Sequence, residues 1–376
     1  MKIKILVIAI LFITSCSSIQ KSDNVISLNT LIEKSKLDYK IRSLPKEIHL
    51  FFLQTEEVSS LPAEVQGFVT NSYHYNSEIS YRPQILLFPM KNGECIVQES
   101  NADLNVVFYL STKKNNTSLK KCFQKLPKSK TLFISKNSDN FGFDSAFIVS
   151  REEEKRKLIK EMEAFADKFI VIDEINNIDN DSVMRLLKEE EKQIIGSKTF
   201  NYAESSQDFF SEILKVNRSK ERLRKLSRRI SKPIEGNLRI REDVNSFFFS
   251  INLEQARNLK PALDYVSERN FNIFILNSWE SNDYYKYVEK DLNGSVHSDF
   301  PIMMPIEMPK FISDEKRSRE FAIGYDTYEI ILLKYGSVKT RNHTYKGLSG
   351  KINIQGNEIK RSAYLFEINQ TGIEIL

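Results

Sequence analysis

Cysteine and histidine are the side chains through which proteins most often form covalent bonds or bind metals, and this sequence has three cysteines and four histidines. The histidines His49, His74, His297 and His343 do not have the spacing of metal ligands. The sequence also lacks the GxSxG, GxxxxGK[ST] and HExxH motifs, which position a nucleophile, a phosphate or a zinc ion. We therefore expect a protein that is not an enzyme and that has no metal site and no cofactor.

The first cysteine, Cys16, lies in a context that favours lipid attachment. Two lysines precede nine consecutive apolar residues, a run too short to cross a bilayer, which takes about 20 residues. A basic start, a short apolar run and small residues are typical of a secretory signal peptide. The letters ITSC, ending at Cys16, resemble the bacterial lipobox, in which the cysteine sulfur takes a diacylglycerol and the cysteine becomes the new N-terminus. We predict a signal peptide over 1–15 and a lipid on Cys16; an ordinary signal peptide is the alternative.

The residue after Cys16 predicts in which bacterial membrane the lipoprotein is anchored. Ser17 stands where an aspartate would retain a bacterial lipoprotein in the inner membrane, so we expect anchoring on the periplasmic side of the outer membrane. Two or three acyl chains hold such an anchor stably. The polar segment 16–44 then serves as a tether with an r.m.s. span of roughly 30 Å.

The other two cysteines, Cys95 and Cys122, form an even pair in an oxidising compartment. A disulfide bond between them is one interpretation, and two buried thiols are the other.

The composition is that of a globular protein, with 41% hydrophobic and 28% charged residues among 376. The formal net charge is only +5, from 55 basic and 50 acidic residues. This balance is too mild to indicate a nucleic-acid partner.

Short apolar runs alternate with helical patterns along most of the chain. Runs of buried-strand length lie at 47–54, 84–90, 105–111, 130–135, 145–150, 168–173, 197–202, 243–252 and 271–278. Helical patterns lie at 61–75, 118–126, 181–193, 205–216 and 253–270, and a charged helix starts at 151. Pro261, inside one helical pattern, predicts a kink or break. This alternation indicates βαβ units and doubly wound parallel sheets.

There are too many strands for one small sheet, so we predict an α/β fold with two lobes. The N-lobe would comprise 45–149 plus about 306–340, and the C-lobe 150–305 plus about 341–376. The acidic runs REEEK (151–155) and KEEEK (188–192) are interpreted as solvated helix faces.

One segment concentrates positive charge: 218–232 has eight basic residues and one acidic residue. In a helix, Arg218, Arg222, Lys225 and Arg229 would share one face, while Leu223 and Leu226 would pack inward. The segment is either a solvated surface helix or a binding site for an acidic protein surface or anionic lipid headgroups.

The second half of the chain resembles the LppC/LpoA family of outer-membrane lipoproteins. That family has a basic helix, an arginine-rich turn before an Asp-Val strand, and a Gln-Ala-Arg…Lys-Pro helix. The matching residues here are Arg239, Arg241, Asp243, Val244, Gln255, Ala256, Arg257, Lys260 and Pro261. The segments REFAIGYDTYEIILL (319–333) and YKGLSGKINIQGNEIK… (345–376) match the family's later helix and its G-L-(S/T)-G ending.

The resemblance implies a type 1 periplasmic-binding-protein-like fold and a regulator that binds and activates a class A penicillin-binding protein during peptidoglycan synthesis. Members of the family commonly carry an N-terminal helical repeat domain. Only about 30 residues separate Cys16 from the first predicted strand here, so we expect that domain to be missing. The alternative is a periplasmic solute-binding lipoprotein for an amino-acid-like ligand, although the stretch SKNSDNFG (135–142) has no Ser/Thr cluster of the kind such proteins usually offer.

Overall fold

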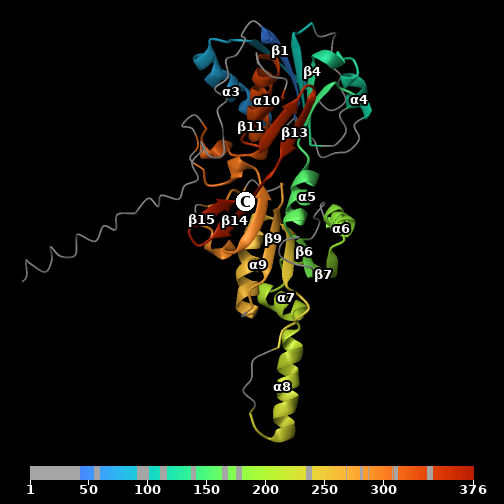
Figure 1. The fold of residues 1–376 in the computed structure, drawn as a ribbon, viewed down its shortest axis with the longest axis vertical. Helices are drawn as coiled ribbons and strands as arrows, with labels where there is room; N and C mark the ends of the chain where they lie inside the picture. The colour runs from blue at the N-terminus through green and yellow to red at the C-terminus, as the bar shows by residue number, and fades with distance from the viewer. Residues whose placement is uncertain are drawn as a thin grey trace, which may run out of the picture.

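The structure is a computed structural model that describes residues 43–54, 60–90, 101–110, 117–136, 141–162, 168–174, 180–233, 239–267, 269–279, 283–286, 288–306, 308, 312–336 and 342–376. Two α/β lobes follow one another along the longest axis, and one helix projects from the far end of the second lobe (Figure 1).

The N-lobe is built on an eight-stranded sheet in the order β11-β12-β13-β5-β4-β3-β1-β2. These strands are β1 (Glu47–Leu53), β2 (Gln84–Met90), β3 (Leu104–Tyr109), β4 (Thr131–Ser135), β5 (Ser145–Ile148), β11 (Asn342–Lys346), β12 (Lys351–Gln355) and β13 (Glu358–Ser362). The first five are parallel, β13 pairs parallel with β5, and β11 to β13 pair antiparallel with one another. Every residue of β3 is buried, as expected for a parallel strand covered on both faces.

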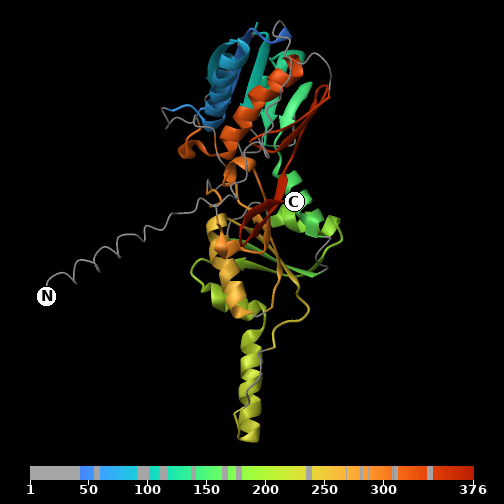
Figure 2. The ribbon, with the colours of Figure 1, turned by 60° about the vertical axis from the view of Figure 1, so that its left-hand side comes forward.

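Helices cover both faces of this sheet. On one face, α3 (Ala63–Ile79) and α10 (Arg319–Gly336) lie side by side (Figure 2). On the other face, the short α4 (Thr117–Phe123) packs Leu119 and Phe123 against Val107 and Phe133 of the sheet. Helix α10 is buried on nearly all sides, so its apolar residues need no amphipathic pattern.

The C-lobe is built on a seven-stranded sheet in the order β15-β14-β10-β9-β8-β6-β7. Its strands are β6 (Lys168–Glu174), β7 (Gln193–Phe200), β8 (Ser246–Ile251), β9 (Asn272–Asn277), β10 (Ser295–Asp299), β14 (Tyr364–Asn369) and β15 (Gly372–Ile375). The five strands β6 to β10 are parallel, whereas β14 and β15 join antiparallel.

The three phenylalanines of β8 show how the two faces of this sheet are filled. Phe248 packs in the cluster beneath α5 (Arg151–Glu161) and α6 (Asn180–Glu189). Phe247 and Phe249 point to the opposite face, which is covered by α7 (Ser206–Ile213) and α9 (Leu253–Val266). Helix α8 (Val216–Ile230) follows α7, and four 3-10 turns lie at Lys128–Lys130, Lys290–Leu292, Pro301–Met303 and Asp314–Lys316.

The prediction that 341–376 belongs to the C-lobe is wrong for most of that segment. β11, β12 and β13 extend the N-lobe sheet, where β13 pairs with β5. Ile352 and Ile354 of β12 and Ile359 of β13 are buried in the core. Only β14 and β15 join the C-lobe. The sequence could not show this, because a strand can extend the edge of either sheet, as β13 does in parallel with β5 and β14 does antiparallel to β10.

The predicted break at Pro261 does not occur, since α9 continues through this residue to Val266. A proline inside a helix costs about 3 kcal/mol, and the buried side chains of Leu259, Leu263 and Ala256 on the same helix offset that cost by packing against the sheet.

Candidate functional site

Helix α8 carries the predicted partner-binding residues on a projection. It leaves the C-lobe after Lys215, whose φ of 59° is left-handed, and only Val216 of the helix is buried. Figures 1 and 2 show the helix extending away from both lobes. Arg218, Arg222, Lys225 and Arg229 are exposed, as are most of the other residues of α8.

The apolar residues of α8 do not all pack inward, contrary to the sequence interpretation. Leu223 is half-buried, but 43% of Leu226 and 56% of Ile230 remain exposed. The reason is that the distal half of α8 lies beyond the C-lobe, so no part of the lobe core reaches these side chains.

The charge of α8 is largely uncompensated within the helix, which has seven basic residues and one acidic residue, Glu221. Glu221 Oε1 lies 2.8 Å from Lys225 Nζ, and the hydrogen bond from Lys225 lowers the pKa of Glu221. An exposed i,i+4 pair of this kind adds little to stability, because solvent screens it. The helix therefore presents a net positive surface that the fold itself does not use.

The base of α8 is fixed by the chain that returns to the C-lobe. The amide of Arg241 donates to the carbonyl of Leu214 (3.1 Å), and the amide of Arg239 donates to Ser219 Oγ (2.9 Å). The Arg241 guanidinium donates two hydrogen bonds to Asp243 at 2.8 and 2.7 Å, which lower the pKa of Asp243 to about 2. These contacts anchor the projection at its root.

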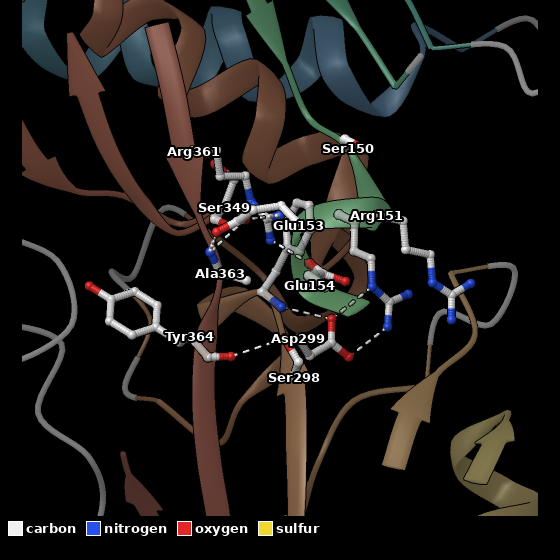
Figure 3. Close-up of polar contacts among 12 residues, drawn as sticks. Ser150, Arg151, Glu153, Glu154, Ser298, Asp299, Ser349, Arg361, Ala363 and Tyr364 are labelled. Atoms are coloured by element: carbon white, nitrogen blue, oxygen red, sulfur yellow. Dashed lines mark hydrogen bonds and ion pairs between the residues drawn. The ribbon is translucent and has the colours of Figure 1, made fainter. Parts of the chain in front are cut away.

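A second polar cluster lies where the chain passes between the lobes (Figure 3). From β13 of the N-lobe, Arg361 Nη2 lies 2.5 Å from Glu154 Oε1 on α5 of the C-lobe, and both side chains are almost fully buried. Glu154 Oε2 also accepts a hydrogen bond from Trp279 Nε1 (2.9 Å). The Arg361 guanidinium lies 4.1 Å from the ring centre of Phe300.

A second buried ion pair joins the lobes beside the first. Arg319, at the start of α10, donates from Nε to Asp299 Oδ1 (2.8 Å) and from Nη2 to Asp299 Oδ2 (2.7 Å), a bidentate arrangement at the end of β10. Both side chains are 1% exposed. Asp299 also accepts from the Phe300 amide (2.7 Å) and from Asn277 Nδ2 (3.1 Å). The junction therefore holds the two lobes together through paired charges that are buried from solvent.

The interpretation of REEEK (151–155) as a solvated face is wrong for its last three residues. Glu154 and Lys155 are buried, and both carboxylate oxygens of Glu153 accept from the Ala363 amide, at 3.2 and 2.9 Å. A charged run gives no sign that its binding partners lie about 200 residues later, so Glu154 and Arg361 could not be recognised from the sequence. Arg319 and Asp299 are only 20 residues apart, but no motif marks them as a pair.

Of the cysteines and histidines considered from the sequence, some lie in the core and some lie outside the described residues. Cys16 and Cys95 lie outside the described residues; Cys122 is buried on α4 and is disulfide-bonded, and its pairing with Cys95 stays a prediction. His297 is a core residue: its ring nitrogens lie 2.7 Å from Ser295 Oγ and 3.1 Å from the Tyr285 hydroxyl, and burial lowers its pKa to about 3.

The part of the chain that the structure describes shows neither a metal-binding cluster nor a membrane-spanning helix. Its residues contain no group of three or more His, Cys, Asp or Glu side chains able to hold a metal ion. None of the described helices is both long enough and apolar enough to span a membrane.

A carboxyl cluster on the N-lobe side of the junction makes stability depend on pH. Glu64, at the start of α3, lies near Glu320 and Lys136, which form an ion pair. Burial raises the pKa of Glu64 to about 7, and the charge of Glu320 adds to the increase. The folded protein thus holds this proton more tightly than the unfolded chain, so the stabilising effect is complete below pH 4.5 and is lost as the pH rises through 7.

Glu64→Gln is therefore expected to flatten the pH profile of stability. Between pH 5 and pH 7.5, the free energy of unfolding of the wild type should fall by about 2 kcal/mol more than that of the variant. Urea unfolding at the two pH values measures how the free energy of unfolding changes in the wild type and in the variant. Parallel profiles for the two proteins would contradict the assignment of this proton to Glu64.

The arrangement of the lobes can be compared with known structures. The C-domain of LpoA from Haemophilus influenzae, described as a regulator of PBP1A, superposes with a TM-score of 0.54 over 88% of this chain and 99% of that domain, at 12% identity. A putative branched-chain amino acid ABC transporter protein from Rhodospirillum rubrum gives a TM-score of 0.57 over 89% of this chain and 100% of that one, at 11% identity. This chain has a type 1 periplasmic-binding-protein-like fold.

The predicted fold class is therefore confirmed, with sheets that are mixed but mostly parallel. The resemblance to the LppC/LpoA family is supported as a structural relationship, which at this identity concerns the fold alone. The match spans 58% of full-length Haemophilus influenzae LpoA, at a TM-score of 0.52. No protein-family model matches the sequence, and no curated protein does so either.

Proposed function

We propose that this protein is a non-catalytic regulator of peptidoglycan synthesis that binds and activates a class A penicillin-binding protein from a lipid anchor on the outer membrane. The fold is shared by a regulator and by proteins of solute transport, and a fold alone does not determine function. The support that favours a regulator comes from α8.

Helix α8 is the observation that carries the proposal. Its basic residues lie on a projection that contributes only Val216 to the core, and Leu226 and Ile230 remain exposed beside them. Charged helices of this kind speed and orient association with an acidic partner, and exposed apolar residues next to them can be desolvated in the complex. A solute-binding protein closes its two lobes around the ligand. A projecting helix at the distal end of one lobe would not contact a ligand bound between the lobes.

Charge reversal of α8 tests the proposal. The variant with Arg218, Arg222, Lys225 and Arg229 changed to Glu should bind the periplasmic part of a class A penicillin-binding protein at least about tenfold more weakly than wild type at low salt. The difference should shrink as salt rises, because exposed charges are screened. The melting temperature should be unchanged, since these side chains make no core contacts.

The matched control reverses four exposed lysines of the N-lobe: Lys121, Lys125, Lys128 and Lys130. This variant has the same net charge as the α8 variant, so equal weakening in both would indicate a general charge effect and remove α8 from the interface. Unchanged binding of the α8 variant at low salt would do the same.

Solute binding is the second candidate, favoured by the likeness to the Rhodospirillum rubrum protein. Under this alternative, wild type would not bind a penicillin-binding protein, and branched-chain amino acids would raise its melting temperature.

The anchor is part of the proposal and rests on the lipobox-like sequence before Cys16. The mature protein should begin at Cys16 and carry acyl chains, palmitate among them, which mass spectrometry of the purified protein would detect. An unmodified cysteine, or cleavage at another residue, would contradict the anchor.

A further inference from the structure

A groove on the C-lobe is not explained by partner binding through α8. It has a volume of about 790 Å³ and lies between the N-terminus of α7 and the outer side of α9, next to the end of β7. Its aromatic, charged and carboxamide lining residues are Tyr202, Glu204, Gln207, Gln255, Asn258 and Tyr265.

The groove is polar and carries little net charge. Glu204 alone is charged among the described residues that line it. Its carboxylate lies 3.7 Å from Lys198 Nζ, which also pairs with Glu212 at 2.7 Å. The other polar groups are hydroxyls and the carboxamides of Gln207, Gln255 and Asn258, each of which can both donate and accept hydrogen bonds. Such a lining suits a neutral ligand that is itself rich in donors and acceptors.

Two tyrosine rings give the groove large aromatic surfaces. Tyr202 is 53% exposed and Tyr265 is 77% exposed. Tyr202 is held in place because its hydroxyl donates to Glu174 Oε2 (2.7 Å), lies 3.3 Å from Asn252 Nδ2, and its ring meets Phe200 edge-on at 6.0 Å. Burial and the bond to Glu174 raise the pKa of Tyr202 to about 12, so the phenol stays neutral. A fixed, exposed ring loses little conformational entropy when a ligand covers it.

We propose that this groove binds a neutral oligosaccharide. The tyrosine rings would cover the apolar faces of successive sugar rings, while the carboxamides would pair with hydroxyl and acetamido groups. A peptide would instead need an apolar recess for a side chain, and the lining offers mainly polar surface. The assignment of the ligand as a cell-wall glycan strand rests on the proposed function, whereas saccharide binding itself does not.

The test uses the full-length protein and the tetramer of N-acetylglucosamine as the probe, with calorimetry as the measurement. Wild type should bind the tetramer, and Tyr265→Ala and Asn258→Ala should each weaken binding about tenfold, which corresponds to about 1.4 kcal/mol. The matched control is Tyr73→Ala, which removes a tyrosine of the N-lobe that is 81% exposed and should leave affinity unchanged.

Several outcomes would overturn the proposal: no binding of the tetramer by wild type at millimolar concentration, equal affinity in all variants, or an equal loss in the Tyr73 control. Tighter binding of a neutral tetrapeptide, with the same dependence on Tyr265, would assign the groove to peptides instead. The charge-reversed α8 variant should bind the tetramer with the affinity of wild type. Partner binding through α8 and saccharide binding in the groove can therefore be tested independently.

Discussion

Arg319→Met is expected to lower the free energy of unfolding by about 3–5 kcal/mol, because it leaves the Asp299 carboxylate buried without its cation. Asp299 is 1% exposed, and its two remaining partners are neutral donors, the Phe300 amide and the Asn277 side chain. Neutral hydrogen bonds stabilise a buried charge less than a bidentate arginine does. Urea unfolding at pH 7 measures the loss.

The control for this prediction is an exposed ion pair on β13 of the N-lobe sheet. Lys360 Nζ lies 2.7 Å from Glu358 Oε1 at the surface, so Lys360→Met should change stability by about 0.5 kcal/mol or less. The double variant Arg319→Met/Asp299→Leu should recover part of the loss, since no unpaired charge remains. Equal effects of Arg319→Met and Lys360→Met would show that burial does not determine the strength of the junction.

Gly324→Ala is expected to destabilise the N-lobe by about 3 kcal/mol or more, against the usual effect of this substitution. Alanine normally stabilises a helix relative to glycine by up to about 1 kcal/mol. At Gly324 a Cβ atom would lie only 1.7 Å from the backbone carbonyl oxygen of Glu64 on α3. Neither backbone can yield without separating α3 from α10, which exposes packed side chains such as Phe68 and Tyr328.

Gly67 on α3 is the reciprocal position, since its added Cβ would lie 2.1 Å from the Phe321 carbonyl oxygen. Gly67→Ala should therefore have an effect similar to that of Gly324→Ala. Gly196→Ala is the control, because the nearest atom to its Cβ is a side-chain carbon of Ile170 at 3.9 Å. Thermal unfolding of the three variants would measure the contrast, and a stable Gly324→Ala protein would contradict the close helix contact.

Much of the fold could be predicted from apolar runs alone. The strand predicted at 47–54 occurs at Glu47–Leu53, and that at 271–278 occurs at Asn272–Asn277. Parallel strands buried on both faces have continuous apolar sequences, which are hard to confuse with loops. Strand β8 is the clearest case, because three consecutive phenylalanines must fill two different cores.

The lobe junction could not be predicted, because its geometry depends on residues far apart in the sequence. Glu154 and Arg361 are 207 residues apart, and nothing near either residue indicates the other. The exposure of Leu226 was missed for a related reason. A helical pattern shows which residues share a face, but it does not show whether a core lies opposite that face.

The segment 342–376 affects the order in which the protein can fold. It supplies β11 to β13 to one sheet and β14 and β15 to the other, so during synthesis neither sheet is complete until this segment has been made. Until then β5 and β10 present unpaired edges, and such edges invite association between chains. Closing the N-lobe sheet also requires contacts across more than 200 residues, which slows folding. Newly made chains should therefore stay incompletely folded, and open to chaperones, for longer than chains whose lobes are each continuous in sequence.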